Sequence, residues 1–522
     1  MNHQEFLLSL QSRGLRAWQA NFVVSFLETD SSAFHLLAAP PGMGKSYTSI
    51  SIAAELASRG ARRILVLPPA SLCDEWRERL GNAQSVLPVV RVTGQNFREI
   101  EAARPIGESP LNANGIYVIS QDLLKNSAVF DGVSTVVWDF VVVDEAHRFL
   151  ARKRPVLQNR MAAANVTVRP LAIMEHLVVN DCVRRLLLLS ATPLPTLEPW
   201  LHPSADNAVL LPSPLVTTSW FGVLTDWDGT AVGRPRVPLD VHSYTRSANE
   251  VTCLLQFLDA MKALKAASGG NDLFIQLLTQ RASSSVFALE QRLRRVAHAL
   301  RTTLERGGDL SMEVSAAQAG LLTLQGDVES TPPDSRVEWT DKVGGLEIIN
   351  QCLNVLEMIS SDEKLDVFKR LVRSIVDSEP NGIARVCVLS AYGDTVSYLH
   401  TAADDVGLPL FKVTLANSFA ERQATVKQFL DLGGLIVGSD EALSEGLSMP
   451  QVTHVIHYDL PPNPLVLEQR RGRFDRIGRT DPLRMHVLRD ESGVFPFESH
   501  LIDQTAVDQD FDAEQIEKLG AS

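Results

Sequence analysis

The 522-residue sequence has no apolar run of the roughly 18–20 residues that a membrane-spanning helix needs. Its first residues, MNHQEFLLSLQSRGLR, lack the basic start, apolar core and small-residue cleavage site of a secretion signal. The five cysteines stand singly, without C-x-x-C spacing, which argues against a zinc site and against a disulfide framework. These absences predict a cytoplasmic protein that does not associate with membranes.

Positive charge is also in short supply, since 49 Lys and Arg face 62 Asp and Glu and the net charge is −13. The excess is concentrated at the end of the chain. From Asp490 onwards there are nine acidic residues and one base, Lys518, which leaves a charge of −5 for the first 489 residues. A nearly balanced body can still carry a basic groove, so nucleic-acid binding is not excluded. We expect the acidic end to be a solvated segment; mimicry of nucleic acid or docking on a partner is the alternative.

Two series of short apolar runs, rich in Val, Leu and Ile, alternate with helical patterns along the chain. Strands that are buried on both faces and alternate with helices indicate parallel sheets in α/β lobes. The first series lies at 36–39, 62–67, 115–120, 138–144 and 185–190. The second series lies at 384–390, 410–413, 435–437, 454–459 and 485–488.

The stretch between the two series differs in character. Residues 200–240 lack clear periodicity, 249–306 have a helical pattern, and 307–345 are polar and interrupted by Pro332 and Pro333. At about 150 residues per domain, the length suits two or three domains. The predicted organisation is a first lobe at 1–205, a linker and helical insert at 206–345, a second lobe at 346–490 and an acidic tail at 491–522.

The segment APPGMGKS, which ends at Ser46, follows an apolar run and opens a helical pattern, as a phosphate-binding loop does. Gly42 and Gly44, on either side of Met43, allow backbone N–H groups to curl around phosphate oxygens. Lys45 can reach the β- and γ-phosphates, and the Ser46 hydroxyl can bind Mg²⁺. The segment predicts a site for ATP and Mg²⁺; a glycine-rich turn without a ligand is the alternative.

Further along, the apolar run in WDFVVVDEAH delivers two adjacent carboxylates, Asp144 and Glu145. Asp144 is placed to hold Mg²⁺, and Glu145 to orient and deprotonate the attacking water. Solvated acids at the end of a strand are the alternative. The two motifs in this order, each after a predicted strand, favour a nucleotide-hydrolysing site.

These motifs resemble those of superfamily 2 helicases, in which D-E-A-H is the second motif and A-x-x-G-x-G-K-[ST] the phosphate loop. The resemblance implies two RecA-like lobes that close on Mg-ATP. The segment LRAWQ resembles the family's adenine-reading motif, which assigns that role to Gln19. The segment SATP resembles the third motif and implies that Ser190 and Thr192 contact nucleic acid.

The segment QRRGRFDRIGR, which begins at Gln469, resembles the sixth motif of the same family. The resemblance places Gln469 in the nucleotide site and implies that Arg473 and Arg476 reach the γ-phosphate from the second lobe. Guanidinium suits this role because it is always charged and presents a planar fork of donors. A basic surface helix is the alternative. Gly446 lies in GSDEALSEGLS, which resembles the fifth motif and implies that Gly446 lies in the nucleotide site.

Other segments resemble the Swi/Snf-like branch of the superfamily, and within it the bacterial RNA-polymerase-recycling type. The segment LPPASLCDEW implies that Ser71 touches one DNA strand, and VISQDLL implies the same for Ser120. HYDLPPNP, which begins at His457, also resembles a motif of this branch. RASSSVFAL, which begins at Arg281, looks like a segment that these proteins carry between their lobes.

The function expected from this resemblance is ATP-driven translocation on double-stranded DNA within a larger protein complex, in phage defence or in remodelling of a polymerase. A strand-separating helicase on RNA or single-stranded DNA is one alternative. The other is a nucleotide-dependent switch or assembly subunit that remodels a protein partner.

Overall fold

The computed structural model divides into two compact units, the first ending at Pro235 and the second beginning at Arg236. Each unit holds one parallel β-sheet. The structure describes residues 3–29, 34–83, 86–102, 109–146, 176–178, 180–191, 215–220, 223–232, 237, 239–305, 339–379, 384–444, 447, 449–460, 464–475, 479 and 482–496.

The first sheet has seven strands in the order β3-β4-β2-β5-β6-β1-β7, and every pairing is parallel. Its strands are β1 (Phe34–Ala38), β2 (Arg63–Leu67), β3 (Val89–Val92), β4 (Gly115–Ile119), β5 (Phe140–Val143), β6 (Leu186–Ser190) and β7 (Leu215–Ser219). The five apolar runs of the first series form β1, β2, β4, β5 and β6, so those predictions are confirmed. β3 and β7 were not predicted.

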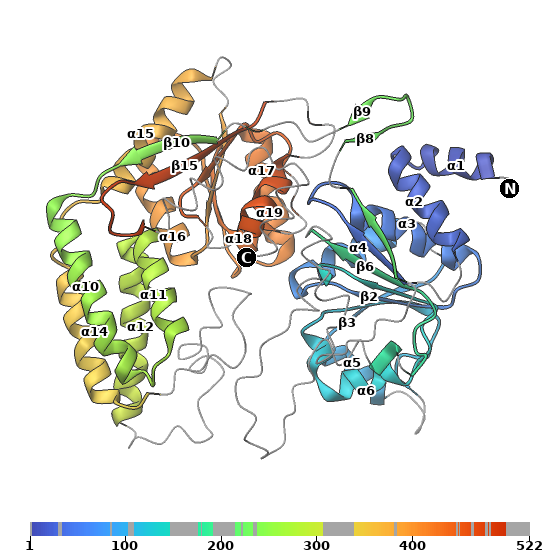
Figure 1. Ribbon diagram of the computed structural model, residues 1–522, viewed down its shortest axis with the longest axis horizontal. Coiled ribbons are helices and arrows are strands. Elements are labelled where there is room, and N and C mark those ends of the chain that lie inside the picture. Colours follow the sequence, from blue (N-terminus) through green and yellow to red (C-terminus); the bar gives the residue numbers. More distant parts are fainter. Residues whose placement is uncertain are drawn as a thin grey trace. The chain divides into compact units, whose positions relative to one another are not determined.

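Helices cover both faces of this sheet (Figure 1). Ile64 and Val66 of β2 pack with one set of helices, whereas Leu65 and Leu67 pack with the other, because successive residues of a strand face opposite sides. The first set is α1 (His3–Ser12), α2 (Ala17–Glu28), α3 (Lys45–Ser58) and α4 (Cys73–Asn82). The second set is α5 (Gly94–Ala102) and α6 (Ser127–Ser134); the 3₁₀ turns are η1 (Ala70–Leu72) and η2 (Leu123–Lys125).

A short antiparallel hairpin, β8 (Leu224–Thr225) with β9 (Ala231–Val232), follows β7. It belongs to the first unit. Leu224 and Val232 pack against the hydrophobic core on the α2 side of the sheet.

The second sheet has six strands in the order β10-β15-β14-β11-β13-β12, again all parallel. They are β10 (Leu239–Tyr244), β11 (Arg385–Ser390), β12 (Leu410–Val413), β13 (Gly434–Ser439), β14 (His454–His457) and β15 (Arg484–Asp490). One face packs against α15 (Glu363–Ser378) and α16 (Gly393–Ala402). The other packs against α17 (Phe419–Leu432), α18 (Asp440–Ser444) and α19 (Pro464–Phe474); η3 (Asp404–Val406) follows α16. The predicted tandem of two α/β lobes is confirmed.

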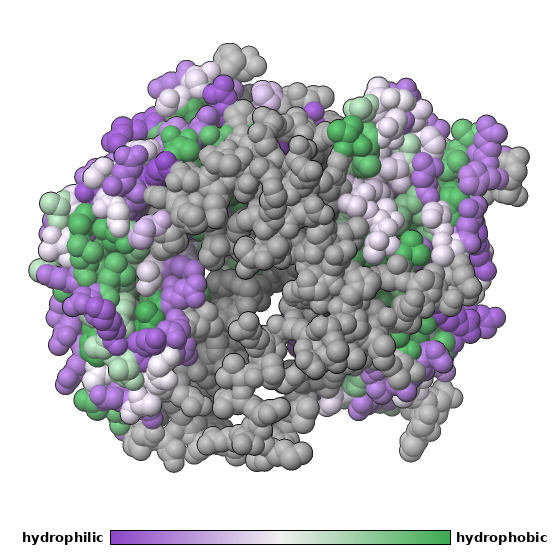
Figure 2. Space-filling view, in the orientation of Figure 1, coloured by the Kyte–Doolittle hydropathy of each residue, from purple (hydrophilic) through white to green (hydrophobic). Residues whose placement is uncertain are grey.

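A bundle of helices completes the second unit (Figure 1). It consists of α10 (Ala248–Ala267), α11 (Asp272–Ser284), α12 (Val286–Glu305) and α14 (Lys342–Leu356), which share one apolar core. On the face seen in Figure 2, hydrophilic and apolar residues are interspersed over the bundle. No helix in the described part of the chain combines the length and apolar composition needed to cross a membrane.

The segment 206–345, which the sequence suggests is one linker and insert, is shared between the two units. β7 joins the first sheet, whereas β10 joins the second sheet beside β15. The bundle packs within the second unit, and α14 extends beyond residue 345. Because its strands pair with different sheets, this segment is divided between the two units. The apolar periodicity of the segment does not show this boundary.

A buried ionic cluster anchors the start of the bundle to the second sheet. Arg246 precedes α10, and its Nε donates to Asp490 Oδ2 of β15 at 2.6 Å. Arg246 also pairs with Glu250 in the first turn of α10. The three side chains are 3%, 1% and 1% exposed, and the guanidinium lies over the Phe495 ring. Removing one partner would leave the others buried and uncompensated.

Arg246→Ala is therefore expected to lower the free energy of unfolding of the second unit by about 3–5 kcal/mol. The midpoint of urea unfolding measures this. Arg294→Ala is the matched control, because Arg294 pairs with Glu290 and Glu357 while 48% exposed, and such exposed pairs contribute about 0–1 kcal/mol. Equal small shifts for the two variants would contradict the importance of the buried cluster.

Candidate active site

The phosphate-loop segment connects the end of β1 to the start of α3. Gly42 and Gly44 have φ of 87° and 82°, a backbone conformation that glycine adopts readily and other residues rarely do. Gly44 is the N-cap of α3, so the backbone N–H groups of the first helical turn lie at this loop. A Cβ atom at Gly44 would lie 2.1 Å from Nε2 of Gln19, so space as well as conformation requires glycine there.

Lys45 opens α3 and is mostly buried, at 8% exposure. Its Nζ donates to the Ala39 carbonyl oxygen at 2.5 Å and to that of Pro40 at 3.3 Å. The ammonium group thus lies inside the loop that carries it, while Ser46, next along the helix, is partly exposed. A positive charge, N–H donors and a hydroxyl are concentrated at one helix N-terminus, which suits a phosphate group and its cation.

Asp144 and Glu145 follow β5 directly. Trp76 Nε1 donates to Asp144 Oδ2 at 3.0 Å, and Glu145 N donates to Asp144 Oδ1 at 3.0 Å. Gln121 Nε2 donates to the Asp144 carbonyl oxygen at 2.5 Å. Glu145 itself has φ of 47°, in the left-handed region that costs a non-glycine residue about 1–3 kcal/mol. The surrounding contacts hold both residues in one arrangement.

Electrostatics brings Lys45 and the two carboxylates together. The pKa of Asp144 is raised to about 7: burial is the largest cause and the charge of Glu145 adds to it, whereas Lys45 and the hydrogen bond from Trp76 act to lower it. The carboxylate pair is therefore short of positive charge. A divalent cation at Asp144 would supply it, and the available oxygen donors, Asp144 and the Ser46 hydroxyl, are of the kind that Mg²⁺ prefers. The residues fit Mg²⁺ bound with ATP.

Gln19 connects α2 to the phosphate-loop segment. Its Oε1 accepts from the Arg16 backbone N–H at 2.8 Å, and its Nε2 donates to the Met43 carbonyl oxygen at 3.3 Å. The side chain is buried, at 6% exposure. The geometry places Gln19 beside the loop, and the adenine-reading role remains a prediction.

The β8–β9 hairpin holds the start of α2, a contact that the sequence did not predict. Asp226 Oδ1 accepts from the Ala17 backbone N–H at 3.1 Å, and its other oxygen pairs with Arg16. Trp227 Nε1 donates to the Leu15 carbonyl oxygen at 2.8 Å. Burial acts to raise the pKa of Asp226. The hydrogen bonds from Arg16 and from the backbone N–H groups of Ala17 and Trp227 outweigh burial and hold the pKa below its ordinary value. The available signal was the turn-forming sequence DWDGT, which predicts a turn but not its partner.

The structure describes only some of the side chains predicted to contact nucleic acid. Ser120 Oγ accepts from the backbone N–H of Leu123, the first residue of η2, at 3.0 Å. Ser190 ends β6 with no exposed surface, and its contact with nucleic acid stays a prediction. Ser71 lies in η1; its side chain and Thr192 are outside the described residues.

The arginine-rich segment lies in the second unit. Arg473 is on α19 and is 7% exposed. Gly446, Arg476 and the side chain of Gln469 are outside the described residues, so their roles stay predictions. The structure brings together Gln19, the phosphate-loop segment, Asp144 and Glu145 in one unit, and places Arg473 in the other.

Trp76→Phe is expected to raise the Mg²⁺ concentration for half-maximal ATP hydrolysis about tenfold, because the indole N–H orients the Asp144 carboxylate. The rate at saturating Mg²⁺ should stay close to that of the unsubstituted protein. A Mg²⁺ titration of phosphate release measures both. Trp138→Phe is the matched control, since Trp138 is equally buried but its Nε1 donates to the Val133 carbonyl oxygen. The same shift in both variants would contradict a specific role for Trp76.

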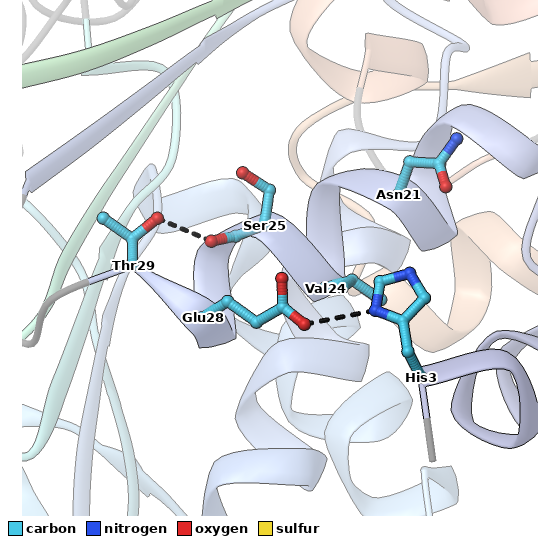
Figure 3. Close-up of a pocket in the computed structure, with 6 residues that line it drawn as sticks. All are labelled: His3, Asn21, Val24, Ser25, Glu28 and Thr29. Atoms are coloured by element: carbon cyan, nitrogen blue, oxygen red, sulfur yellow. Dashed lines mark hydrogen bonds and ion pairs between the residues drawn. The ribbon is translucent and has the colours of Figure 1, made fainter.

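A shallow surface pocket of about 380 Å³ lies on the first unit, away from these residues (Figure 3). His3 Nδ1 and Glu28 Oε1 lie 3.2 Å apart across it, with side chains 61% and 64% exposed. An ion pair this exposed contributes little energy. The lining residues are His3, Asn21, Val24, Ser25, Glu28 and Thr29. They include none of the residues predicted to bind a nucleotide, and we assign no function to the pocket.

Two family models match the chain. Residues 7–194 match a model described as the type III restriction enzyme, res subunit, and residues 363–478 match the helicase conserved C-terminal domain. The first match spans the phosphate-loop segment and the Asp144–Glu145 pair, and the second spans Arg473. Both halves of the predicted site therefore lie in matched regions.

The curated relatives are distant but extensive. The RNA polymerase-associated protein RapA of Pseudomonas putida is 25% identical over 464 residues, which cover 87% of this chain and 44% of that protein. The chain thus spans less than half the length of this relative. The uncharacterised ATP-dependent helicase YqhH of Bacillus subtilis is 21% identical over 473 residues, which cover 90% of this chain and 73% of that protein.

Among solved structures, the helicase domain of Pyrococcus furiosus Hef is similar to this chain with a TM-score of 0.50. The sequence identity is 14%, and the match covers 95% of this chain and 99% of the other. This likeness supports the two-lobed helicase fold.

Proposed function

We propose, from the premise that this chain is a superfamily 2 helicase-type ATPase of the Swi/Snf-like branch, that it uses ATP hydrolysis to move along double-stranded DNA. The observation that carries this proposal is the cluster of Lys45, Asp144 and Glu145 in the first unit. There the buried Asp144 and the partly exposed Glu145 adjoin a helix N-terminus suited to bind phosphate.

The residues of the cluster divide the work of hydrolysis. The backbone N–H groups after Gly42 and the ammonium of Lys45 hold the phosphates. Asp144 and Ser46 would hold Mg²⁺, which when bound would supply positive charge at the phosphate oxygens. Glu145 orients the attacking water and takes its proton. Gln19, tied to the loop at Met43, is placed to contact the base of the nucleotide.

We infer that the second lobe completes the site. Arg473 and Arg476 would stabilise the charge on the γ-phosphate, as the resemblance to the sixth motif implies. Hydrolysis would then require the two lobes to close on one nucleotide. Such a requirement would couple ATP hydrolysis to movement of one lobe relative to the other. That coupling would drive the protein along DNA.

The choice of duplex DNA as the track rests on the Swi/Snf-like segments that carry Ser71 and Ser120. Contacts to the phosphate backbone would make binding independent of sequence and strongly dependent on salt. Work inside a larger complex is part of the proposal. A polymerase is one candidate partner, supported by the printed name of the RapA relative, and a restriction-like defence system is another, supported by the first family model. A cytoplasmic location is proposed on the same basis.

Nucleic-acid-stimulated ATP hydrolysis tests the track. Phosphate release should rise with duplex DNA, rise less with single-stranded DNA or RNA, and lose its stimulation as salt increases. Stronger stimulation by RNA or single-stranded DNA would favour a strand-separating helicase. Hydrolysis that no nucleic acid changes, but that a partner protein raises, would favour the switch alternative.

A further inference from the structure

The junction between α11 and α12 of the helical bundle is buried against the second lobe. Its residues Ser283, Ser284 and Ser285 are at most 4% exposed. Lys364 of α15, itself 2% exposed, donates from Nζ to the carbonyl oxygens of Ser283 at 2.7 Å and Ser284 at 3.2 Å. An ammonium at the carbonyl end of α11 complements the helix dipole and fixes this end of the bundle against the lobe.

The Ser284 hydroxyl reaches a buried carboxylate. It donates to Asp459 Oδ2 at 2.6 Å and lies 2.9 Å from the Thr395 hydroxyl of α16. Asp459 also accepts from the Ser390 hydroxyl at the end of β11 and from the Ala391 backbone N–H. Asp459 therefore connects the α11–α12 junction of the bundle to the end of β11 in the sheet.

The same aspartate holds the arginine-bearing helix. Arg470 of α19 is fully buried, donates to the Asp459 carbonyl oxygen at 2.6 Å, and lies 3.4 Å from Asp459 Oδ1. It also donates to Asp440 Oδ2 of α18 at 2.5 Å, and its Nη1 lies 3.3 Å from His457 Nδ1. Arg473 lies three residues further along α19, and residues at this spacing lie on one side of a helix. Hydrogen bonds therefore connect Ser284 through Asp459 to Arg470, and α19 carries both Arg470 and Arg473.

We propose that Ser284 and Asp459 are positioning residues, through which the helical bundle sets the placement of α19 and so of Arg473 for ATP hydrolysis. The inference rests on the proposed role of Arg473 at the γ-phosphate. It gives the bundle a defined task, because a partner that shifts the α11–α12 junction changes the rate of hydrolysis without touching the nucleotide. Neither residue is among those proposed to bind ATP, so their loss is expected to affect turnover rather than nucleotide affinity.

The test compares Ser284→Ala with Ser283→Ala in the full chain. Both serines are buried neighbours in α11, but the Ser283 hydroxyl donates to the Gln280 carbonyl oxygen within its own helix, so its removal spares the hydrogen bonds to Asp459. We expect Ser284→Ala to lower kcat about tenfold at an unchanged KM for ATP, because small displacements of a positioned group have large effects on rate. Ser283→Ala should keep the parental kcat. Equal kcat for the two variants would overturn the proposal.

Thermal unfolding separates positioning from a purely structural role. The two alanine variants should have similar midpoints, with the kcat difference intact. If Ser284→Ala does not fold, the pair Ser284→Cys and Ser283→Cys fills the same space with a much weaker donor. The same ordering of kcat is expected for that pair, and its absence would overturn the proposal equally.

A double-mutant cycle with Asp459→Asn provides the second readout. If Ser284 acts through Asp459, Ser284→Ala should add little to the loss of kcat that Asp459→Asn causes alone, whereas independent effects would multiply. Multiplication would overturn the proposal. All rates are taken with and without duplex DNA. Absence of DNA stimulation would count against the proposed track, while the ratio of Ser284→Ala to Ser283→Ala still decides the positioning role.

Discussion

Glu145→Gln is expected to lower the turnover number for ATP by about 10²–10⁴-fold, the usual contribution of a general base. The amide keeps the size and shape of the side chain but cannot accept the proton of the attacking water. Glu145 has an unusual backbone conformation, with φ of 47°. Glutamine should adopt this conformation at a similar energetic cost, because the two side chains are nearly the same in size and shape. Phosphate release under saturating ATP measures the rate.

ATP affinity should stay near its parental value in this variant, so that the nucleotide is bound and not turned over. A fluorescent ATP analogue measures the affinity. Glu28→Gln is the control, because it removes the same charge from the surface of α2, where Glu28 is paired with His3. Parental turnover in Glu145→Gln would show that another group is the base.

Lys45→Ala is expected to reduce ATP turnover by about a hundredfold or more, because the ammonium is the main positive charge at the phosphate site of the first lobe. Unlike Glu145→Gln, it should also weaken nucleotide binding. The substitution takes a cation away from the buried Asp144 and its neighbour Glu145, and loss of that charge raises the pKa of Asp144 further. Parallel titrations with the fluorescent analogue and with Mg²⁺ measure both effects.

Tyr47→Phe is the matched control for Lys45→Ala. Tyr47 lies two residues along α3 and is 42% exposed, and its hydroxyl donates to the Arg13 carbonyl oxygen at 2.5 Å. It should bind and hydrolyse ATP at parental levels. Tight binding of the analogue by Lys45→Ala would mean that the phosphates are held elsewhere.

Most strands that the sequence predicts lie inside the sheets; β12, at one edge of the second sheet, is the exception. The predicted β1, β2, β4, β5 and β6 lie inside the first sheet, where apolar residues face both layers of helices. The missed β3, β7 and β10 all lie at sheet edges. An edge strand is partly exposed and need not be a continuous apolar run, as in LDVHSY of β10. Apolar periodicity cannot separate such a strand from a loop.

In the candidate site, too, some features depend on residues that are close in the sequence and others on residues that are far apart. The loop around Gly42 and Gly44 is predictable because its conformation depends on residues within a few positions. The bond from Trp76 to Asp144 joins residues 68 positions apart, and that from Ala17 to Asp226 joins residues 209 apart. Ser284 and Asp459 are 175 positions apart. Such contacts depend on the tertiary fold, so the spacing of residues within one segment does not predict them.

Movement on DNA is the claim that most needs a direct measurement, and triplex displacement provides it. A third strand bound to a linear duplex should be released by the unsubstituted protein in the presence of ATP and Mg²⁺. Glu145→Gln should release none while still binding ATP. Displacement that requires ATP hydrolysis is the predicted result. A protein that hydrolyses ATP at a rate unaffected by duplex DNA, and leaves the third strand in place, would contradict the proposed translocase.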